Sequence, residues 1–361
     1  MRRDVLELDL ASGAATVEAI PTLADVEAVR LLLSGGSVVD WQRLAWNNFD
    51  EIDRYLATHL LDMGNPADRE RLRYVFNEAV SYLEENLGLR FPAEMRNPVD
   101  VREVFLWASH ADRFRKKQIL ACVVCKLMHV IHHMEAADLK FRAPIAQEVL
   151  FDLAEAHILQ QARRMRDDGI PVVSFYGSRK SRASMIAKLL AKKENLAATI
   201  FDELRFRLVV ERHEDLFRAL SWMAQKMFPF NYVIPGQSYN NLLDPAEVIA
   251  RAPPGDAEAQ PVVDEPVVAQ FGKNEFSGAS YRMINFIVDY PVRLPESDLG
   301  RFHFELGQVV YVMVEFQLLD EQTARNNETG ENAHHLYKQR QHDVVEARLK
   351  RGGARRRRSN A

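Results

Sequence analysis

The pattern of hydrophobic and polar positions divides the chain into two halves of different texture. From about residue 38 to 166, apolar residues recur at helical spacing, as in FDEIDRYLATHLLDM, RLRYVFNEAVSYLEENLGL and EVLFDLAEAHILQQARRM. Gly88 and Pro92 punctuate the ends of two of these segments. The pattern predicts a helical N-terminal domain over residues 1–166.

Short runs with strand-like character alternate with helical runs after residue 166. PVVSFYG, LRFRLVV, YRMINFIV and VVYVMVEFQLL are predicted strands, and SRASMIAKLLAKKE and DLFRALSWMAQKMF are predicted helices. This β-α-β-α-β-β order predicts a mixed sheet with helices packed against it. The fold class is therefore expected to be α+β, with a second domain over residues 167–340.

Two stretches follow neither pattern. Residues 244–275 are rich in Pro, Ala, Asp and Glu, and we expect a mobile loop inserted into the second domain, because strands continue after it. Residues 341–361 are predicted to form a last helix near Asp343 to Lys350 and a basic tail. The run Arg355 to Arg358 predicts weak, salt-sensitive contact with RNA or the ribosome, with a solubilising tail as the alternative.

Composition limits the class of protein. The chain has 361 residues, 47% of them hydrophobic, and a formal net charge of -4, which suits two globular domains and not a polycation. Two cysteines, Cys122 and Cys125, fit a reducing compartment. The N-terminus lacks the apolar region of a signal peptide, and the apolar run near residues 119–131 is interrupted by Lys126. We expect a cytoplasmic protein that makes no membrane contact.

The first two chemical motifs lie in the segments YGSRKSRASMIAKLL and IFDELRFRLVV. In the first, Lys180, Ser184 and Lys188 are four residues apart, which predicts that they lie on one face of one helix. In the second, strand alternation puts Arg205 and Arg207 on one face and apolar residues on the other. Cations and hydroxyls at a helix start suit a triphosphate; a solvated helix face and surface arginines are the alternatives.

The other two motifs lie in SGASYRMINFIVDYPV and VEFQLLDEQTARNNETGENAHHLYK. In the first, Tyr281 and Asn285 are expected on the same face of a strand, where a tyrosine ring could stack on a purine base. An ordinary strand tyrosine is the alternative. In the second, Glu315 and Gln317 lie in a predicted strand.

Taken in order, the four segments resemble the RelA/SpoT-like (p)ppGpp synthetase domain family, which has a nucleotidyltransferase-like fold. The resemblance covers roughly half of the chain. The last segment is the most specific, because the family strand Glu-x-Gln is followed by Ala-Glu-x-Gly-x-x-Ala-His-x-x-Tyr-Lys. The matching residues, with no gap, are Glu328, Gly330, Ala333, His334, Tyr337 and Lys338.

The resemblance implies transfer of pyrophosphate from ATP to a guanine nucleotide. It assigns the catalytic and metal-ligating roles to Asp202 and Glu315, with Mg²⁺ as cofactor and Glu315 as a ligand or as the base that takes the ribose 3'-hydroxyl proton. The residues it assigns to nucleotide binding are Arg179, Lys180, Ser184, Lys188, Arg207, Tyr281, Asn285, Gln317, His334 and Lys338.

Several positions depart from the family pattern. The chain has Ser178 where the family has arginine, Arg205 where it has a small residue, and Asn285 where it has histidine. Ala-Ser replaces Asn-Gly before Tyr281, and Leu319-Asp320 replaces Arg-Thr. Two alternatives therefore stay open: a degenerate nucleotide-binding regulator, and a toxin-type relative that modifies an adenosine nucleotide or tRNA.

A further cluster lies in the segment ILACVVCKLMHVIHHMEA. Its members are Cys122, Cys125, His129, His132 and His133, and a packed helix with polar histidines is favoured over a metal site. Bifunctional members of the family carry a His-Asp metal hydrolase upstream. The single His-Asp pair here is His342-Asp343, near the C-terminus. We therefore expect no alarmone hydrolase activity.

Overall fold

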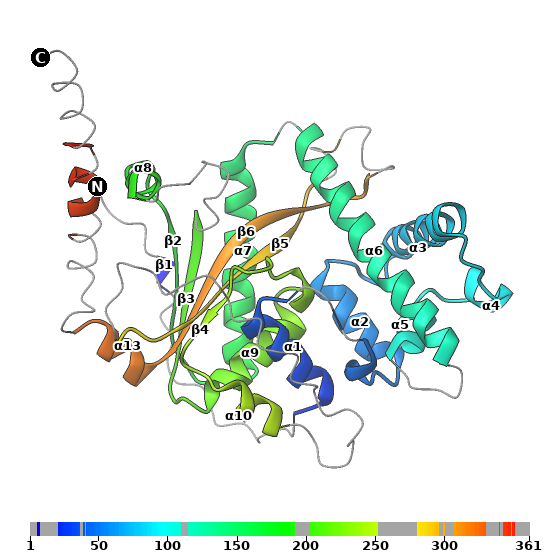
Figure 1. The fold of residues 1–361 in the computed structure, drawn as a ribbon, viewed down its shortest axis with the longest axis horizontal. Helices are drawn as coiled ribbons and strands as arrows, with labels where there is room; N and C mark the ends of the chain where they lie inside the picture. The colour runs from blue at the N-terminus through cyan, green and yellow to red at the C-terminus, as the bar shows by residue number, and fades with distance from the viewer. Residues whose placement is uncertain are drawn as a thin grey trace, which may run out of the picture.

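A computed structural model describes most of the chain. The described residues are 6–7, 21–36, 39, 41–109, 115–143, 145–191, 203–251, 280–295, 299, 306–329, 339, 342–347 and 349–350. They form a mixed sheet of six strands, in the order β1-β2-β3-β6-β5-β4, with helices on both sides of it (Figure 1).

The strands follow the predicted order with small shifts at their ends. Their bounds are β1 Leu6–Glu7, β2 Val172–Arg179, β3 Leu204–Val210, β4 Tyr239–Asn240, β5 Ile284–Arg293 and β6 Val309–Asp320. β3 pairs with β6 in parallel, and the other pairs are antiparallel. The prediction of an α+β fold with a mixed sheet is therefore confirmed.

The N-terminal half is helical, as its apolar spacing predicted. The helices are α1 Leu23–Ser34, α2 Phe49–Thr58, α3 Pro66–Leu87, α4 Ala93–Arg96, α5 Arg102–Ser109, α6 Arg115–Arg142 and α7 Gln147–Asp167. Local sequence explains their ends. Thr22 and Asn48 form capping boxes at the starts of α1 and α2, and Gly88 ends α3 in the left-handed conformation.

One face of the sheet is apolar and supports the core. Strand β3 alternates strictly between buried apolar residues and half-buried arginines up to Leu208. On the apolar face, the rings of Phe175, Phe206 and Phe316 stack across β2, β3 and β6 with centroids 5.5 and 6.0 Å apart. A Cβ at Gly177 would lie 2.7 Å from the Phe206 ring, so this position needs glycine. Helices α7 and α9 (Asp215–Lys226) pack against the strands.

The helical half and the sheet share one hydrophobic core. Helix α6 packs along β6, and Lys140 donates to the Tyr311 carbonyl oxygen at 2.9 Å. Figure 1 shows α2, α3, α5 and α6 to one side of the strands and α8 and α13 to the other. Over Lys116–Arg142, α6 is long and apolar enough by composition to cross a membrane, and a core helix has the same features.

Four local features differ from the sequence predictions. Leu6–Glu7 add an edge strand to the sheet, although residues 1–166 were predicted helical, and α1 begins well before residue 38. Helix α10 (Pro245–Ala250), capped by the Asp244 side chain, occupies the start of the predicted loop; residues 252–275 of that loop lie outside the description. Helix α8 (Arg182–Ala191) begins after Lys180. Asp244 and Pro245 are strong helix-start residues, and their signal was missed.

Candidate active site

A group of polar side chains lies on the face of the sheet opposite the phenylalanine layer. On parallel strands β3 and β6, Arg205 is in register with Glu315 and Arg207 with Gln317; on β5, Asn285 is opposite Gln317. Residues two apart on a strand point to the same face, so all five share one side of the sheet. We call these five residues the Glu315 patch.

Glu315 is the buried centre of this patch, at 6% exposure. Its Oε2 accepts a hydrogen bond from Arg205 Nε at 2.8 Å. Its Oε1 accepts from Gln317 Nε2 at 2.9 Å and from Asn285 Nδ2. A buried carboxylate needs such donors to be stable. A carboxylate has roughly four acceptor positions, so three hydrogen bonds leave about one position open.

Arg207 and Gln317 form the second half of the patch. Arg207 Nε and Nη2 donate to Gln317 Oε1 at 3.2 and 2.9 Å. The Arg207 guanidinium also lies 5.9 Å from the ring centroid of Tyr176 on β2. Gln317 therefore links the Arg207 cation to the Glu315 carboxylate through its two amide ends.

The residues of the first motif do not share one helix face. Lys180 lies in the connection before α8, where its backbone N–H donates to the Glu203 carbonyl at 2.8 Å. Ser184 lies in the first turn of α8, and its N–H donates to Ser181 Oγ at 3.3 Å. The prediction that Lys180, Ser184 and Lys188 lie on one helix face is thus wrong for Lys180, because Ser181 caps the helix after it. Lys188 is in α8, and its side chain is outside the description.

Arg179 points away from the Glu315 patch. By strand alternation it shares the face of Phe175, and its guanidinium pairs with Asp152 and Glu155 of α7, each at 2.5 Å. Desolvation opposes the charge of Arg179, but these two carboxylates raise its pKa. The structure therefore gives the predicted nucleotide-binding residue Arg179 an ion-paired position on the helix-covered face.

Tyr281 lies before strand β5 and not within it. Its carbonyl oxygen accepts from Asn241 Nδ2 at 2.8 Å, and the Met283 N–H donates to Asn241 Oδ1 at 2.8 Å. Asn327 binds both backbone groups of Arg282. These side chains take the backbone groups that a strand ladder would use, so the prediction of Tyr281 and Asn285 on one strand face is wrong.

The positions that replace the family Arg-Thr pair have structural roles. Leu319 is 1% exposed. Asp320 caps α13 (Glu321–Asn327), accepting from the Thr323 N–H and Oγ1, both at 2.8 Å. The polar face of β6 therefore ends at Gln317.

Comparisons with known proteins gave matches among solved structures. No protein-family model and no curated protein matches the chain. The solved structure of small alarmone synthetase 2 from Bacillus subtilis covers 58% of this chain and 98% of its own, at 14% identity and a TM-score of 0.29. Small alarmone synthetase 1 from that organism covers 66% and 98%, at 16% identity and 0.28. This chain is similar to the small alarmone synthetases.

A further structure of small alarmone synthetase 1, bound to its product pppGpp, covers 65% of this chain and 98% of its own, at 14% identity and a TM-score of 0.27. Because all these TM-scores are well below 0.5, the similarity assigns no activity to this chain.

Four predicted features lie outside the described residues. They are Asp202, His334, Lys338 and the Arg355 to Arg358 tail, and their roles stay predictions. One partner that the sequence prediction left out of the site is Arg205. The sequence shows an arginine in one predicted strand and a glutamate in another. Their pairing could not be predicted, because it depends on the parallel register of β3 and β6.

The histidines of α6 pack at its junction with the sheet. His132 Nδ1 lies 3.1 Å from the hydroxyls of both Tyr232 and Tyr311. Burial lowers the pKa of His129 to about 3 and that of His133 to about 4. This is the packed helix with polar histidines that the sequence favoured.

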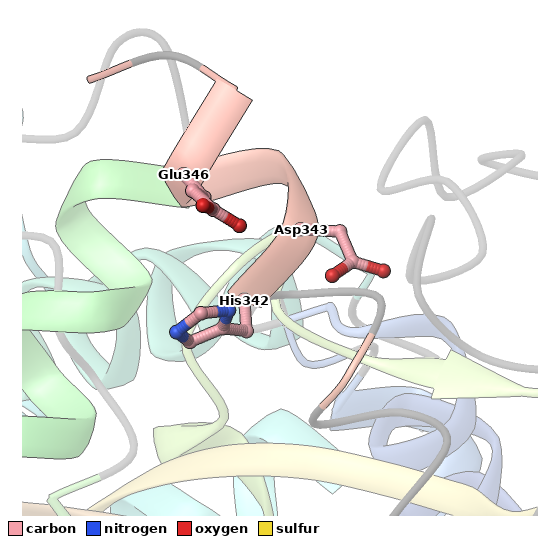
Figure 2. Close-up of side chains that lie close together, drawn as sticks. All are labelled: His342, Asp343 and Glu346. Carbon is pink, nitrogen blue, oxygen red and sulfur yellow. The ribbon is translucent and has the colours of Figure 1, made fainter. Parts of the chain in front are cut away.

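In the described part of the chain, one group of three potential metal-ligating side chains gathers ligand atoms within 4.8 Å: His342, Asp343 and Glu346. Figure 2 shows them on one short helical segment. All three are exposed, and His342-Asp343 is the pair noted in the sequence. Neighbouring charges on a solvated helix explain this group.

Proposed function

We propose that this protein transfers pyrophosphate from ATP to a hydroxyl of a guanine nucleotide or a related acceptor, giving a (p)ppGpp-like product. One observation carries the proposal. Residues from three of the four motifs, far apart in sequence, meet around one buried carboxylate: Arg207 from the second, Asn285 from the third, and Glu315 and Gln317 from the fourth.

The chemistry needs a proton acceptor and a positive environment for phosphates. The acceptor hydroxyl oxygen attacks the β-phosphorus of ATP and forms a new O–P bond. The bond from that phosphorus to the oxygen bridging the α-phosphate breaks, and AMP leaves with the electron pair. The hydroxyl proton passes to the Glu315 carboxylate, which Asn285 and Gln317 orient through Oε1.

In this proposal, the phosphates are bound by Arg207 of the Glu315 patch and by residues at the start of α8. Arg207 offers a guanidinium bonded to a neutral amide, and Lys180 and Ser184 lie at the start of α8. A helix start offers backbone N–H groups to anions. Tyr281, at the turn before β5, is the proposed contact for the base of the acceptor.

Mg²⁺ fits this reaction because it binds through one or two carboxylates together with substrate phosphates. Glu315 keeps about one acceptor position beyond its three hydrogen bonds, and Asp202 would supply the second carboxylate. The ion, when bound, would neutralise charge on the phosphates.

A second function, a nucleotide-binding regulator without catalysis, has two observations in its favour. The Glu315 Oε2 atom is engaged by Arg205, and the Arg-Thr pair of the family is replaced by the buried Leu319 and the helix cap Asp320. Turnover separates the two functions.

The test is incubation with labelled ATP, Mg²⁺ and a panel of acceptors: GDP, GTP, adenosine nucleotides and tRNA. Product masses are then measured. The proposal expects AMP and an acceptor heavier by one pyrophosphoryl group, with a guanine nucleotide as the best acceptor. Nucleotide binding without AMP release for every acceptor would favour the regulator. Transfer only to an adenosine nucleotide or to tRNA would favour the toxin-type reaction.

A further inference from the structure

Arg205 stands where the resembling family has a small residue, and it touches the atom that the proposed reaction needs. It lies in register with Glu315, and its Nε donates to Glu315 Oε2 at 2.8 Å. The Arg205 side chain is 33% exposed, and that of Glu315 is 8% exposed. The arginine is therefore more accessible to a ligand than the carboxylate to which it donates.

The two oxygens of Glu315 have different partners. Oε1 accepts from two neutral amides, Asn285 Nδ2 and Gln317 Nε2. Among the described residues, Arg205 is the donor to Oε2. Loss of the Arg205 bond would leave the carboxylate oriented by the two amides, with Oε2 open to a substrate hydroxyl. Because Asn285 and Gln317 hold Oε1, Glu315 can change its partner at Oε2 while the carboxylate stays in place.

A nucleotide phosphate is the natural competitor for Arg205. The guanidinium binds carboxylates and phosphates with the same planar geometry, and a phosphate carries at least one full negative charge. Arg207, two residues away on the same face, adds a second guanidinium, which donates to the neutral Gln317. Two arginines side by side favour a phosphate-bearing ligand over an uncharged nucleoside.

We propose that Arg205 is a positioning residue that exchanges Glu315 for a phosphate of the bound nucleotide, and that this exchange releases Oε2 to accept the hydroxyl proton. The inference rests on the proposed function and adds a regulatory step to it. Without a nucleotide, the ion pair holds the base inactive. With a nucleotide, a phosphate replaces Glu315 at the guanidinium, and the two amides keep the Glu315 carboxylate hydrogen-bonded through Oε1.

The exchange makes a prediction that can be tested by binding alone. Because Glu315 competes with the phosphate for Arg205, Glu315→Gln should tighten nucleotide binding by about three- to tenfold, the size of a modest ion-pair coupling. In the Arg205→Gln background, Glu315→Gln should change the affinity by less than about twofold. Calorimetric titration of the wild type, both single variants and the double variant gives this cycle.

The ligands in the titration identify the source of the phosphate. A non-hydrolysable ATP analogue and GDP are titrated separately, with guanosine as the uncharged control. The coupling should appear with one of the two phosphate ligands and be absent with guanosine.

Arg207→Gln is the matched control background, because Arg207 bonds to an amide and not to Glu315. In this background the tightening by Glu315→Gln should persist. Circular dichroism confirms that each variant is folded, and Arg205→Lys provides a charged second variant, in which the coupling should be reduced and not lost.

The outcomes separate this inference from the function on which it rests. Equal tightening with and without Arg205, no tightening with either phosphate ligand, or the same coupling with guanosine would overturn the exchange. A coupling that depends on Arg205 supports it. If AMP and product form in the wild type while the cycle is additive, the exchange fails and the function stands. If the coupling is present and no acceptor yields product, the function fails and the competition for Arg205 stands.

Discussion

Arg205 and Glu315 face each other in register on two parallel strands, and Arg205 Nε donates to Glu315 Oε2 at 2.8 Å. The two residues are 110 positions apart in the sequence. Parallel pairing of β3 with β6 brings the second and fourth motifs together, and the antiparallel β5 adds Asn285 from the third. The sheet therefore positions the candidate base, its orienting amides and its cations on three neighbouring strands.

Phosphate binding by Lys180 predicts a selective loss of ATP affinity. Lys180→Ala removes a cation near the start of α8, so the dissociation constant for an ATP analogue should rise by about tenfold, as expected for one charge-assisted contact. Turnover at saturating ATP should fall much less. Lys116→Ala, an exposed residue at the start of α6, is the control. Equal affinities for the two variants would remove Lys180 from the site.

The proposed metal predicts loss of activity in a chelator. With excess EDTA, AMP release should stop, and added Mg²⁺ or Mn²⁺ should restore it, because the phosphates and Glu315 are both negative. Release of AMP is followed by chromatography. Undiminished activity in excess chelator would contradict the assignment of Mg²⁺.

The close approach of β2 and β3 predicts a stability cost at Gly177. A Cβ there would lie 2.7 Å from the Phe206 ring, so Gly177→Ala should destabilise the fold by about 1–3 kcal/mol. Urea unfolding measures the change. Ser178→Ala is the neighbouring control: its side chain is exposed and should change stability by less than about 0.5 kcal/mol. A Gly177→Ala variant as stable as Ser178→Ala would show that Phe206 gives way without cost.

The buried histidines predict acid destabilisation. Burial lowers the pKa of His59 to about 4, that of His129 to about 3 and that of His133 to about 4, and also lowers the pKa of His132. The unfolded chain, with ordinary values near 6.5, then binds more protons than the folded one as the pH falls. The stability contributed by neutral histidines is complete above pH 6.5 and is lost between about 6.5 and 3.

Other charged groups face the same histidines and change the size of this effect. Burial raises the pKa of Asp289 to about 6, so its protonation favours the folded state between about pH 6 and 4 and offsets part of the loss. Lys140 lies near Asp289, and Arg71 lies near His132. The destabilising effect of four histidines exceeds the stabilising effect of one carboxyl group. The free energy of unfolding, measured by urea denaturation, should therefore fall steeply from pH 6.5 to 4. A flat profile would contradict the buried neutral histidines.

The period of two along the strands allowed the sequence to predict which residues face the core. Alternation along LRFRLVV separated Arg205 and Arg207 from the buried Leu204, Phe206 and Leu208, and the structure shows this separation. The two-residue strand β1 has no period to detect, so its addition to the sheet was missed. The division into mixed sheet and helices needed only apolar spacing, because the core requires that spacing.

The misses in the candidate site come from tertiary contacts. The sequence around Tyr281 predicted that it lies in β5. The side chains of Asn241 and Asn327, from outside the segment, instead form hydrogen bonds with the backbone of Tyr281 and Arg282. Arg179 was assigned to phosphates, but carboxylates on α7 bind its guanidinium. Side-chain partners far away in the sequence decided both positions, and spacing within one segment contains no information about them.

The most direct test of the central claim is turnover of Glu315→Gln against Glu321→Gln. The first keeps the size of the side chain and removes the carboxylate at the centre of the patch; the second changes a carboxylate that pairs with Arg325 in α13. With saturating ATP and the best acceptor, we expect the rate of AMP release to fall by about two to four orders of magnitude in Glu315→Gln and to stay near the wild-type rate in Glu321→Gln. Equal, small effects of the two substitutions would contradict a catalytic Glu315.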